Sequence, residues 1–210
     1  MICIVDYGMG NLRSVHKALE HVGYEALVTS NPQRIKNSSK LILPGVGAFG
    51  DCMRNLARFN LTEEVVRSIE TGKPFLGICL GLQLLFEESD EFGPQKGLEI
   101  LPGRVTKFPE TIQDPETGDR YPIPHMGWNT VHIQRESPLF NEIASGSYFY
   151  FVHSYYAIPE DPKDIAATTP YGIDFVCAVQ RDNIYAVQFH PEKSQEVGLQ
   201  FLKNFCQSAG

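Results

Sequence analysis

Length, composition and charge narrow the function of this chain before any motif is considered. Its 210 residues suit one domain with a sizeable core. Acidic residues outnumber Lys and Arg by 25 to 18, so the net charge is −7, and no basic run offers a surface for nucleic acid or acidic lipids. The start of the chain carries no export signal, and no apolar run approaches the roughly 20 residues of a membrane span. We therefore expect a soluble, cytoplasmic protein that binds neither nucleic acid nor membranes.

Through the first 80 residues, short apolar runs alternate with helical patterns. Apolar residues recur at helical spacing in 11–23 and 62–72, and Thr62 is expected to cap the start of the second helix and Gly72 to stop it. Compact apolar or β-branched runs predict strands at 2–7, 24–30, 40–44 and 74–78. Because such runs alternate with helices, we expect a parallel sheet covered on both faces.

After residue 90 the sequence becomes rich in proline, with six between positions 94 and 124. The segment DPETGDR, 114–120, is typical of an exposed turn. Aromatic and β-branched residues predict strands at 148–158, 174–180 and 184–190, and a closing helix is expected at 194–205. We interpret this half as an antiparallel extension of the sheet.

The five cysteines are odd in number and form no CxxC pair, which argues against a disulfide framework or a zinc site and favours a reducing cytosol. Four of them, at positions 3, 52, 177 and 206, fall in strand or helix patterns where a thiol packs as a small hydrophobe. Cys79 differs because it stands between glycines in GICLG, 77–81, where a predicted strand gives way to a helical pattern. No metal ligand set is expected.

The GICLG stretch has the form of a nucleophile elbow, the strand–turn–helix that presents a catalytic residue. Glycines on both sides allow strand and helix to approach closely around a strained residue. At the start of a helix, the positive end of the dipole would favour the thiolate of Cys79, which is the reactive form. The alternative interpretation is an ordinary buried cysteine between packing glycines.

A catalytic thiol usually needs a base, and among six histidines His190 has the most suitable neighbour. It stands at the end of a predicted strand with Glu192 two residues later, so in an extended chain both side chains lean to the same side. Such a carboxylate would hold the ring in one tautomer and stabilise the imidazolium. His16 and His21 are expected to be solvated helix positions. A surface ion pair is the alternative interpretation of His190 and Glu192.

A glycine-rich loop, LILPGVGAFG at 41–50, follows a predicted strand. Its glycines match the G-x-G-x-x-G pattern of dinucleotide sites, but the next strand ends at the Cys79 elbow where an acidic ribose ligand would be expected. The other use of such a loop is to aim a backbone N–H at a developing oxyanion. Paired with the N–H of Leu80, it would complete an oxyanion hole.

Three motifs follow one another along the chain: the glycine-rich loop with its Pro-Gly pair, then G-x-C-x-G-x-Q, then H-P-E. In this order they resemble the pattern of the class I (triad) glutamine amidotransferases. Further stretches narrow the resemblance, within that family, to glutaminase subunits that serve a cyclase in histidine biosynthesis: DYGMGNLRSV near the start, PGVGAFG at 44–50, PHMGWN at 124–129, YFVHSY at 150–155 and FHPEKS at 189–194.

The resemblance implies a flavodoxin-like α/β fold, a three-layer sandwich with a central, mostly parallel sheet and an antiparallel β extension, formed by residues 1–210 as a single domain. It implies hydrolysis of L-glutamine to L-glutamate and ammonia through a Cys-His-Glu triad and a thioester, without a cofactor. The ammonia would pass to a (βα)8-barrel cyclase subunit in a heterodimer. A stand-alone γ-glutamyl cysteine hydrolase, the glutaminase subunit of another amidotransferase and a non-catalytic binding module remain as alternatives.

The resemblance also assigns roles to individual residues. The catalytic residues would be Cys79, His190 and Glu192. Gln83, one helical turn after the nucleophile, can face the same pocket. The oxyanion and substrate would be bound by Val46, Gly47, Leu80, Gln83, His153, Ser154 and Tyr155, and the partner would be contacted by Asn11, Met126, Trp128 and Lys193.

Overall fold

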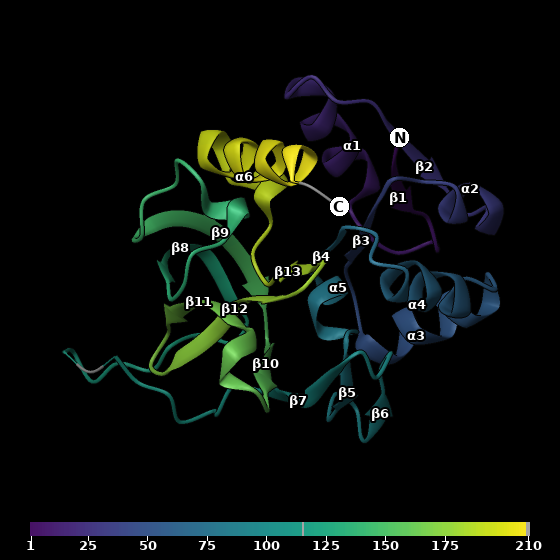
Figure 1. Cartoon of the computed structure of the whole chain (residues 1–210). Helices are drawn as coiled ribbons and strands as arrows, with labels where there is room; N and C mark the ends of the chain where they lie inside the picture. Colours follow the sequence, from purple (N-terminus) through teal and green to yellow (C-terminus); the bar gives the residue numbers. More distant parts are fainter. Residues whose placement is uncertain (115, 209–210) are drawn as a thin grey trace.

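A continuous β-sheet extends through the chain, for which a computed structural model describes residues 1–114 and 116–208 (Figure 1). Four parallel pairings hold its first half together, those of β1 with β2, β1 with β3, β3 with β4 and β4 with β13. These strands are β1 (Ile2–Val5), β2 (Ala26–Thr29), β3 (Lys40–Gly45), β4 (Phe75–Cys79) and β13 (Ile184–Val187). Parallel strands place their carboxyl ends at one edge of the sheet, where sites gather in such folds.

Helices cover both faces of this parallel half, as expected. In β1, Ile2 and Ile4 face one core while Cys3 and Val5 face the other. The first core includes residues of α1 (Leu12–His21) and α6 (Gln195–Gln207), and the second includes residues of α2 (Pro32–Lys36), α3 (Phe49–Arg58) and α4 (Thr62–Glu70). Figure 1 shows α1 and α6 above the sheet and α3 and α4 below it. The predicted three-layer sandwich is therefore confirmed.

The second half extends the sheet with mostly antiparallel strands, also as expected. From β13 the sheet continues through β12, β10, β7, β5 and β6, while β11 joins β12 to β8, and β8 pairs with β9. Among these pairings only β5 with β7 is parallel within the described residues. The strands are β5 (Phe86–Ser89), β6 (Gln95–Lys96), β7 (Leu101–Lys107), β8 (His125–Ile133), β9 (Ser147–His153), β10 (Tyr155–Pro159), β11 (Ile165–Pro170) and β12 (Asp174–Arg181).

Short helical segments connect several of these strands. Helix α5 (Leu80–Gln83) follows β4, and three 3₁₀ turns are η1 (Pro138–Phe140), η2 (Pro162–Asp164) and η3 (Pro191–Lys193). The predicted turn at 114–120 contains residue 115, which lies outside the described residues. On either side of it, Gln113 pairs with Arg120, and the Asp114 carboxylate accepts the N–H groups of Glu116 and Thr117.

Four sequence predictions about element boundaries were wrong. The helical pattern after Cys79 yields only the single turn α5, because the chain then enters β5 to pair with β7. The strand predicted at 148–158 is two strands, since the chain changes partners at Ser154. The strand predicted to reach His190 ends at Val187, and Pro191, which lacks an N–H, starts η3. Leu61 rather than Thr62 is the N-cap of α4, and the Thr62 hydroxyl has no partner among the described residues.

In the described part of the chain, no helix combines the length and the apolar character that crossing a bilayer requires.

Candidate active site

Cys79 occupies a strained turn between β4 and α5. Its φ is +56° and its ψ is −111°, a combination that side-chain-bearing residues rarely adopt and that costs of order 1–3 kcal/mol. A Cβ on Gly81 would lie 1.9 Å from the Leu43 carbonyl oxygen, and a Cβ on Gly77 would lie 2.6 Å from the carbonyl oxygen of Gly81. Both glycines therefore serve the close approach of α5 to β3 and β4. The predicted elbow is present.

The other four cysteines lie outside this turn, and all five thiols in the described residues are free. Burial raises the pKa of Cys52 to about 11 and those of Cys177 and Cys206 to about 12, so these thiols stay protonated at neutral pH. Cys79 lines a cavity instead. Since α5 is only one turn long, its dipole contributes less to a thiolate than the longer helix expected from the sequence would.

His190 and Glu192 form a buried pair beside this cavity. His190 Nδ1 lies 2.8 Å from Glu192 Oε1, and their side chains are only 2% and 1% exposed. The extended geometry expected from the sequence was wrong, because Glu192 lies in η3; the contact forms because His190 directly precedes this turn. Because both side chains are buried, the alternative interpretation of His190 and Glu192 as a surface ion pair is wrong. Since the carboxylate occupies Nδ1, the other ring nitrogen is left for chemistry.

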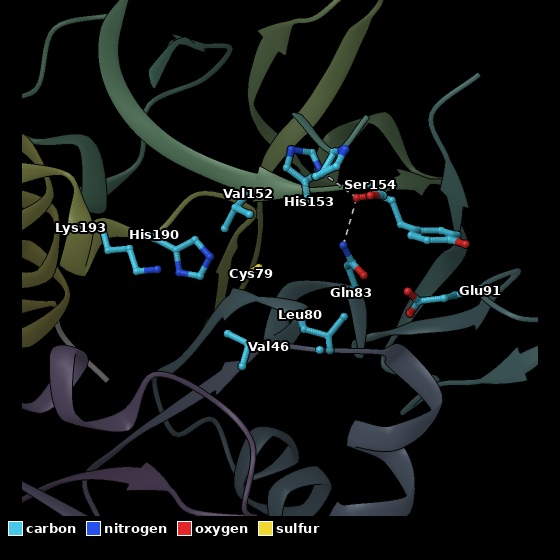
Figure 2. A pocket seen from close by; sticks show the side chains of 13 residues that line it. Val46, Cys79, Leu80, Gln83, Glu91, Val152, His153, Ser154, His190 and Lys193 are labelled. Carbon is cyan, nitrogen blue, oxygen red and sulfur yellow. Dashed lines mark hydrogen bonds between the residues drawn. The ribbon is translucent and has the colours of Figure 1, made fainter. Parts of the chain in front are cut away.

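The free nitrogen of His190 faces the thiol. His190 Nε2 is buried without a hydrogen-bond partner in residues 1–114 and 116–208, and Figure 2 shows the ring directed toward Cys79. Burial opposes the imidazolium, but the attraction of the Cys79 thiolate and the hydrogen bond and charge of Glu192 outweigh it and raise the pKa of His190 to about 10. The arrangement therefore favours the imidazolium form of His190.

A cavity of about 290 Å³ collects most of the residues proposed from the sequence, but not Glu192, Asn11, Met126 or Trp128 (Figure 2). This volume lies at the lower end for small-molecule sites, which suits a ligand of amino-acid size. Cys79 and His190 line it, as do the seven residues predicted to bind the oxyanion and substrate: Val46, Gly47, Leu80, Gln83, His153, Ser154 and Tyr155. Lys193 also lines it.

The glycine-rich loop reaches this cavity because β3 and β4 are neighbours. Gly45 pairs with Cys79 in the parallel ladder, so Val46 and Gly47 continue beside the elbow. Gly47 has φ +95°, a backbone conformation that favours glycine. The loop and the first residue of α5, Leu80, therefore approach the thiol from one side, as an oxyanion hole requires.

Glu91 is a lining residue that the sequence analysis missed. It lies at the end of the cavity with Gln83, away from His190 (Figure 2). Its Oε2 accepts the N–H of Phe49 at the start of α3, at 2.5 Å, and burial raises its pKa. Pro124 and Val152 also line the cavity and were missed. Glu91 lies 12 positions after Cys79 in a loop, and no local pattern marks it as a ligand.

The predicted partner residues lie partly on one exposed face. Met126 and Trp128 of β8 are 63% and 45% exposed. The ring of Trp128 lies 6.1 Å from that of Tyr150 on β9, and Lys193 Nζ lies 5.6 Å from the Tyr150 ring centroid. Tyr150 was not predicted from the sequence. Asn11, half-buried, directly precedes α1, which packs against η3.

No cluster of His, Cys, Asp and Glu suited to a metal ion is present in the described ranges.

Comparisons with known proteins agree with this geometry. The family described as glutamine amidotransferase class-I matches residues 3–209. Imidazole glycerol phosphate synthase subunit HisH of Syntrophotalea carbinolica is 58% identical over 205 residues, covering 98% of each chain. The subunit of the same name from Geobacter sulfurreducens is 54% identical over 204 residues and 97% of each chain, and that of Aquifex aeolicus is 50% identical over 207 residues, 98% of this chain and 96% of its own.

Solved structures share the fold at lower sequence identity. A glutamine amidotransferase crystal structure matches with a TM-score of 0.72 at 19% identity, over 98% of this chain and 100% of that chain. The structure of PurLQS from Thermotoga maritima matches with a TM-score of 0.72 at 20% identity, over 98% and 95%. At this level of identity the likeness concerns the fold.

Proposed function

The chain belongs to the class I glutamine amidotransferase family, and on this premise we propose that it is the glutaminase subunit of an imidazole glycerol phosphate synthase. In this role it hydrolyses L-glutamine to L-glutamate and ammonia and delivers the ammonia to a cyclase subunit. The observation that carries the proposal is the buried His190–Glu192 pair beside Cys79, in a chain whose relatives with the HisH name cover nearly its whole length.

In the proposed reaction, Cys79 forms a covalent intermediate with the substrate. The thiolate attacks the side-chain amide carbon of glutamine, and the protonated Nε2 of His190 gives its proton to the departing nitrogen, so ammonia leaves and a thioester remains. His190 then takes a proton from water, which attacks the thioester and releases glutamate and the Cys79 thiolate. Glu192 keeps the ring oriented in both steps.

Backbone N–H groups at Gly47 and Leu80 are the proposed donors to the oxyanion of both tetrahedral intermediates. The amino-acid end of glutamine would extend toward Gln83, Glu91 and the 153–155 segment at the opposite end of the cavity. A carboxylate there suits the positively charged α-amino group, so we assign that contact to Glu91. Its distance along the chain from the nucleophile explains why the motifs do not contain it.

We further propose that the partner is a (βα)8-barrel cyclase and that it docks on the face formed by Asn11, Met126, Trp128 and Lys193. Met126 and Trp128 offer large exposed apolar side chains, which suit a buried anchor at an interface. Lys193 both lines the cavity and contacts the Tyr150 ring, so a partner on this face would lie beside the catalytic histidine.

The decisive experiment compares two nitrogen sources in the complex with a cyclase. Cys79→Ser should abolish synthesis from glutamine and leave synthesis from ammonium salts intact, because the cyclase chemistry lies in the other subunit. Cys206→Ser, at a thiol far from the cavity, serves as the matched control and should keep both activities. Equal loss with both nitrogen sources in Cys79→Ser would contradict this division of labour, and glutamine hydrolysis without any transfer of ammonia would favour a stand-alone hydrolase.

A further inference from the structure

We propose that Gln188 is a further catalytic residue, whose side-chain N–H binds the sulfur of Cys79. Gln188 is fully buried, and its Nε2 lies 3.7 Å from Cys79 Sγ, within hydrogen-bond distance for sulfur. It directly follows β13 and precedes His190 by two residues, so the two side chains approach the thiol from one segment of chain. This inference rests on the proposed function, since it concerns the same nucleophile.

The direction of the Gln188 amide follows from its neighbour. Gln83 Nε2 donates to the carbonyl oxygen of Tyr155 at 3.0 Å, a contact that only the nitrogen end of that amide can make. The same Nε2 lies 2.9 Å from Gln188 Oε1. Gln188 must therefore present its oxygen to Gln83 and its nitrogen to Cys79. A flipped Gln188 would bring two N–H groups together and turn its oxygen toward the sulfur.

The carbonyl oxygen of Tyr155 also contacts a buried pair of histidines, His153 and His125. Tyr155 O lies 2.8 Å from His153 Nδ1, so this nitrogen carries the proton, and His153 Nε2 accepts from His125 Nδ1 at 3.0 Å. Figure 2 shows the dashed contacts of Gln83 and His153 converging beside Ser154. A neutral pair suits this site, because burial lowers the pKa of His125 to about 4 and that of His153 to about 3.

The far end of this network leads independently to the same proton positions. Asn129 Oδ1 accepts the N–H of Thr130 at 2.8 Å, and Asn129 Nδ2 donates to the carbonyl of Pro170 at 2.8 Å, so this amide has one orientation. Its Nδ2 also lies 3.2 Å from His125 Nε2, which is then an acceptor and leaves the proton on His125 Nδ1. Both ends of the histidine pair therefore give the same proton positions, while the orientation of Gln188 follows from the Tyr155 carbonyl through Gln83.

A fixed donor favours the thiolate over the thiol. Hydrogen bonds to charged acceptors are stronger than those to neutral ones, so an N–H that cannot turn away stabilises the negative sulfur more than the protonated one. The other titratable groups coupled to Cys79 are His190 with Glu192 on the η3 side, and Tyr7 and Cys52 on the side of α3. Substitution of Gln188 leaves these groups in place.

The test measures the pH midpoint at which iodoacetamide alkylates Cys79 in the full-length chain, with mass spectrometry to locate the adduct. Gln188→Met preserves the unbranched shape but removes the donor, and the midpoint should rise by about one pH unit, a tenfold change in the equilibrium. Gln188→Glu keeps an acceptor for Gln83 and turns a negative charge toward the sulfur, so its midpoint should be higher still. Gln180→Met, the same change on β12, is the matched control and should not move it.

An order of midpoints other than wild type, then Gln188→Met, then Gln188→Glu, in chains that melt as the wild type does, would overturn the proposal. If the variants do not fold, NMR of the wild-type chain provides the test. The chemical shift of the Gln188 side-chain amide proton should change with pH at the alkylation midpoint, and this change should be absent in Cys79→Ser. A chemical shift of this amide proton that does not change as Cys79 ionises would also overturn the proposal. Because none of these readouts uses glutamine, failure of the glutaminase assignment would be detected separately, in the assay with two nitrogen sources.

Discussion

The carbonyl oxygen of Tyr150 accepts the backbone N–H of His190 at 2.9 Å, which joins strand β9 directly to the proposed catalytic histidine. Ser194 reinforces this connection, because its Oγ accepts the N–H of Tyr150 at 3.0 Å and donates to the carbonyl of His190 at 2.7 Å. The ring of the same tyrosine contacts Lys193 and Trp128 on the outer face. A partner that moves these side chains would therefore act on the segment that orients His190.

The first prediction concerns this connection. The isolated chain should hydrolyse glutamine slowly, and addition of the cyclase with its nucleotide ligand should raise the rate strongly. Lys193→Ala and Asn11→Ala should lose that rise while iodoacetamide still alkylates Cys79, because Cys79, His190 and Glu192 are unchanged in both variants. Lys203→Ala, an exposed lysine of α6, is the control and should respond like the wild type. An isolated chain that already works at the rate of the complex would refute the prediction.

The second prediction tests the role of Glu192. Glu192→Gln keeps the shape of the side chain but removes the charge that stabilises the imidazolium, so kcat for glutamine should fall by less than the about 10⁴-fold loss known for the orienting carboxylate of serine proteases. The loss is smaller because a cysteine depends less on its base than a serine does. Glu196→Gln, on the exposed first turn of α6, should have no effect. An unchanged kcat in Glu192→Gln would show that the triad assignment is wrong.

The third prediction concerns Glu91 and substrate binding. If its carboxylate holds the α-amino group, Glu91→Gln should raise KM for glutamine more than it lowers kcat, because the amino group is far from the reacting amide. The same change weakens the contact with the N–H of Phe49, so a small loss of thermal stability should accompany it. Glu99→Gln, at a surface position, controls for charge. Loss of stability without any change in KM would leave Glu91 with a structural role only.

The fourth prediction follows from the buried histidine pair. The folded-state pKa values of His125 and His153, about 4 and about 3, lie below the ordinary value of 6.5, so the unfolded chain binds these protons first as the pH falls. Their contribution to stability is therefore fully present above pH 6.5 and is lost as the pH falls toward 4. Each histidine should lower the free energy of unfolding by about 1.4 kcal/mol per pH unit in this window.

Urea unfolding between pH 7 and pH 4 measures this dependence. His125→Gln should reduce the slope of the unfolding free energy against pH by the contribution of about one proton relative to the wild type, since one of the two histidines has been removed. His132→Gln, an exposed position on the same strand, should leave the slope unchanged. Parallel stability curves for His125→Gln and the wild type would mean that His125 is not held neutral in the folded protein.

Several features of this protein followed from the sequence alone, because each depends on a few neighbouring residues. Apolar runs that alternate with helical patterns predicted the layered sheet, since periodicity reports directly which faces are buried. The elbow at Cys79 was predictable because glycines at positions 77 and 81 are the residues that close packing of a strand and a helix demands. The order of three short motifs was enough to indicate the family to which the chain belongs.

Other features depended on contacts between distant parts of the chain. The predicted helix after Cys79 shortened to one turn because pairing of β5 with β7 outweighs local helical preference. Glu91 faces the cavity only because its loop is held against the start of α3, and Gln188 meets the sulfur only because β13 lies beside β4. The proton positions along Asn129, His125 and His153 are set by carbonyl oxygens on other strands. Tertiary structure alone decided these features, because a buried polar group takes its orientation from partners that sequence neighbours do not supply.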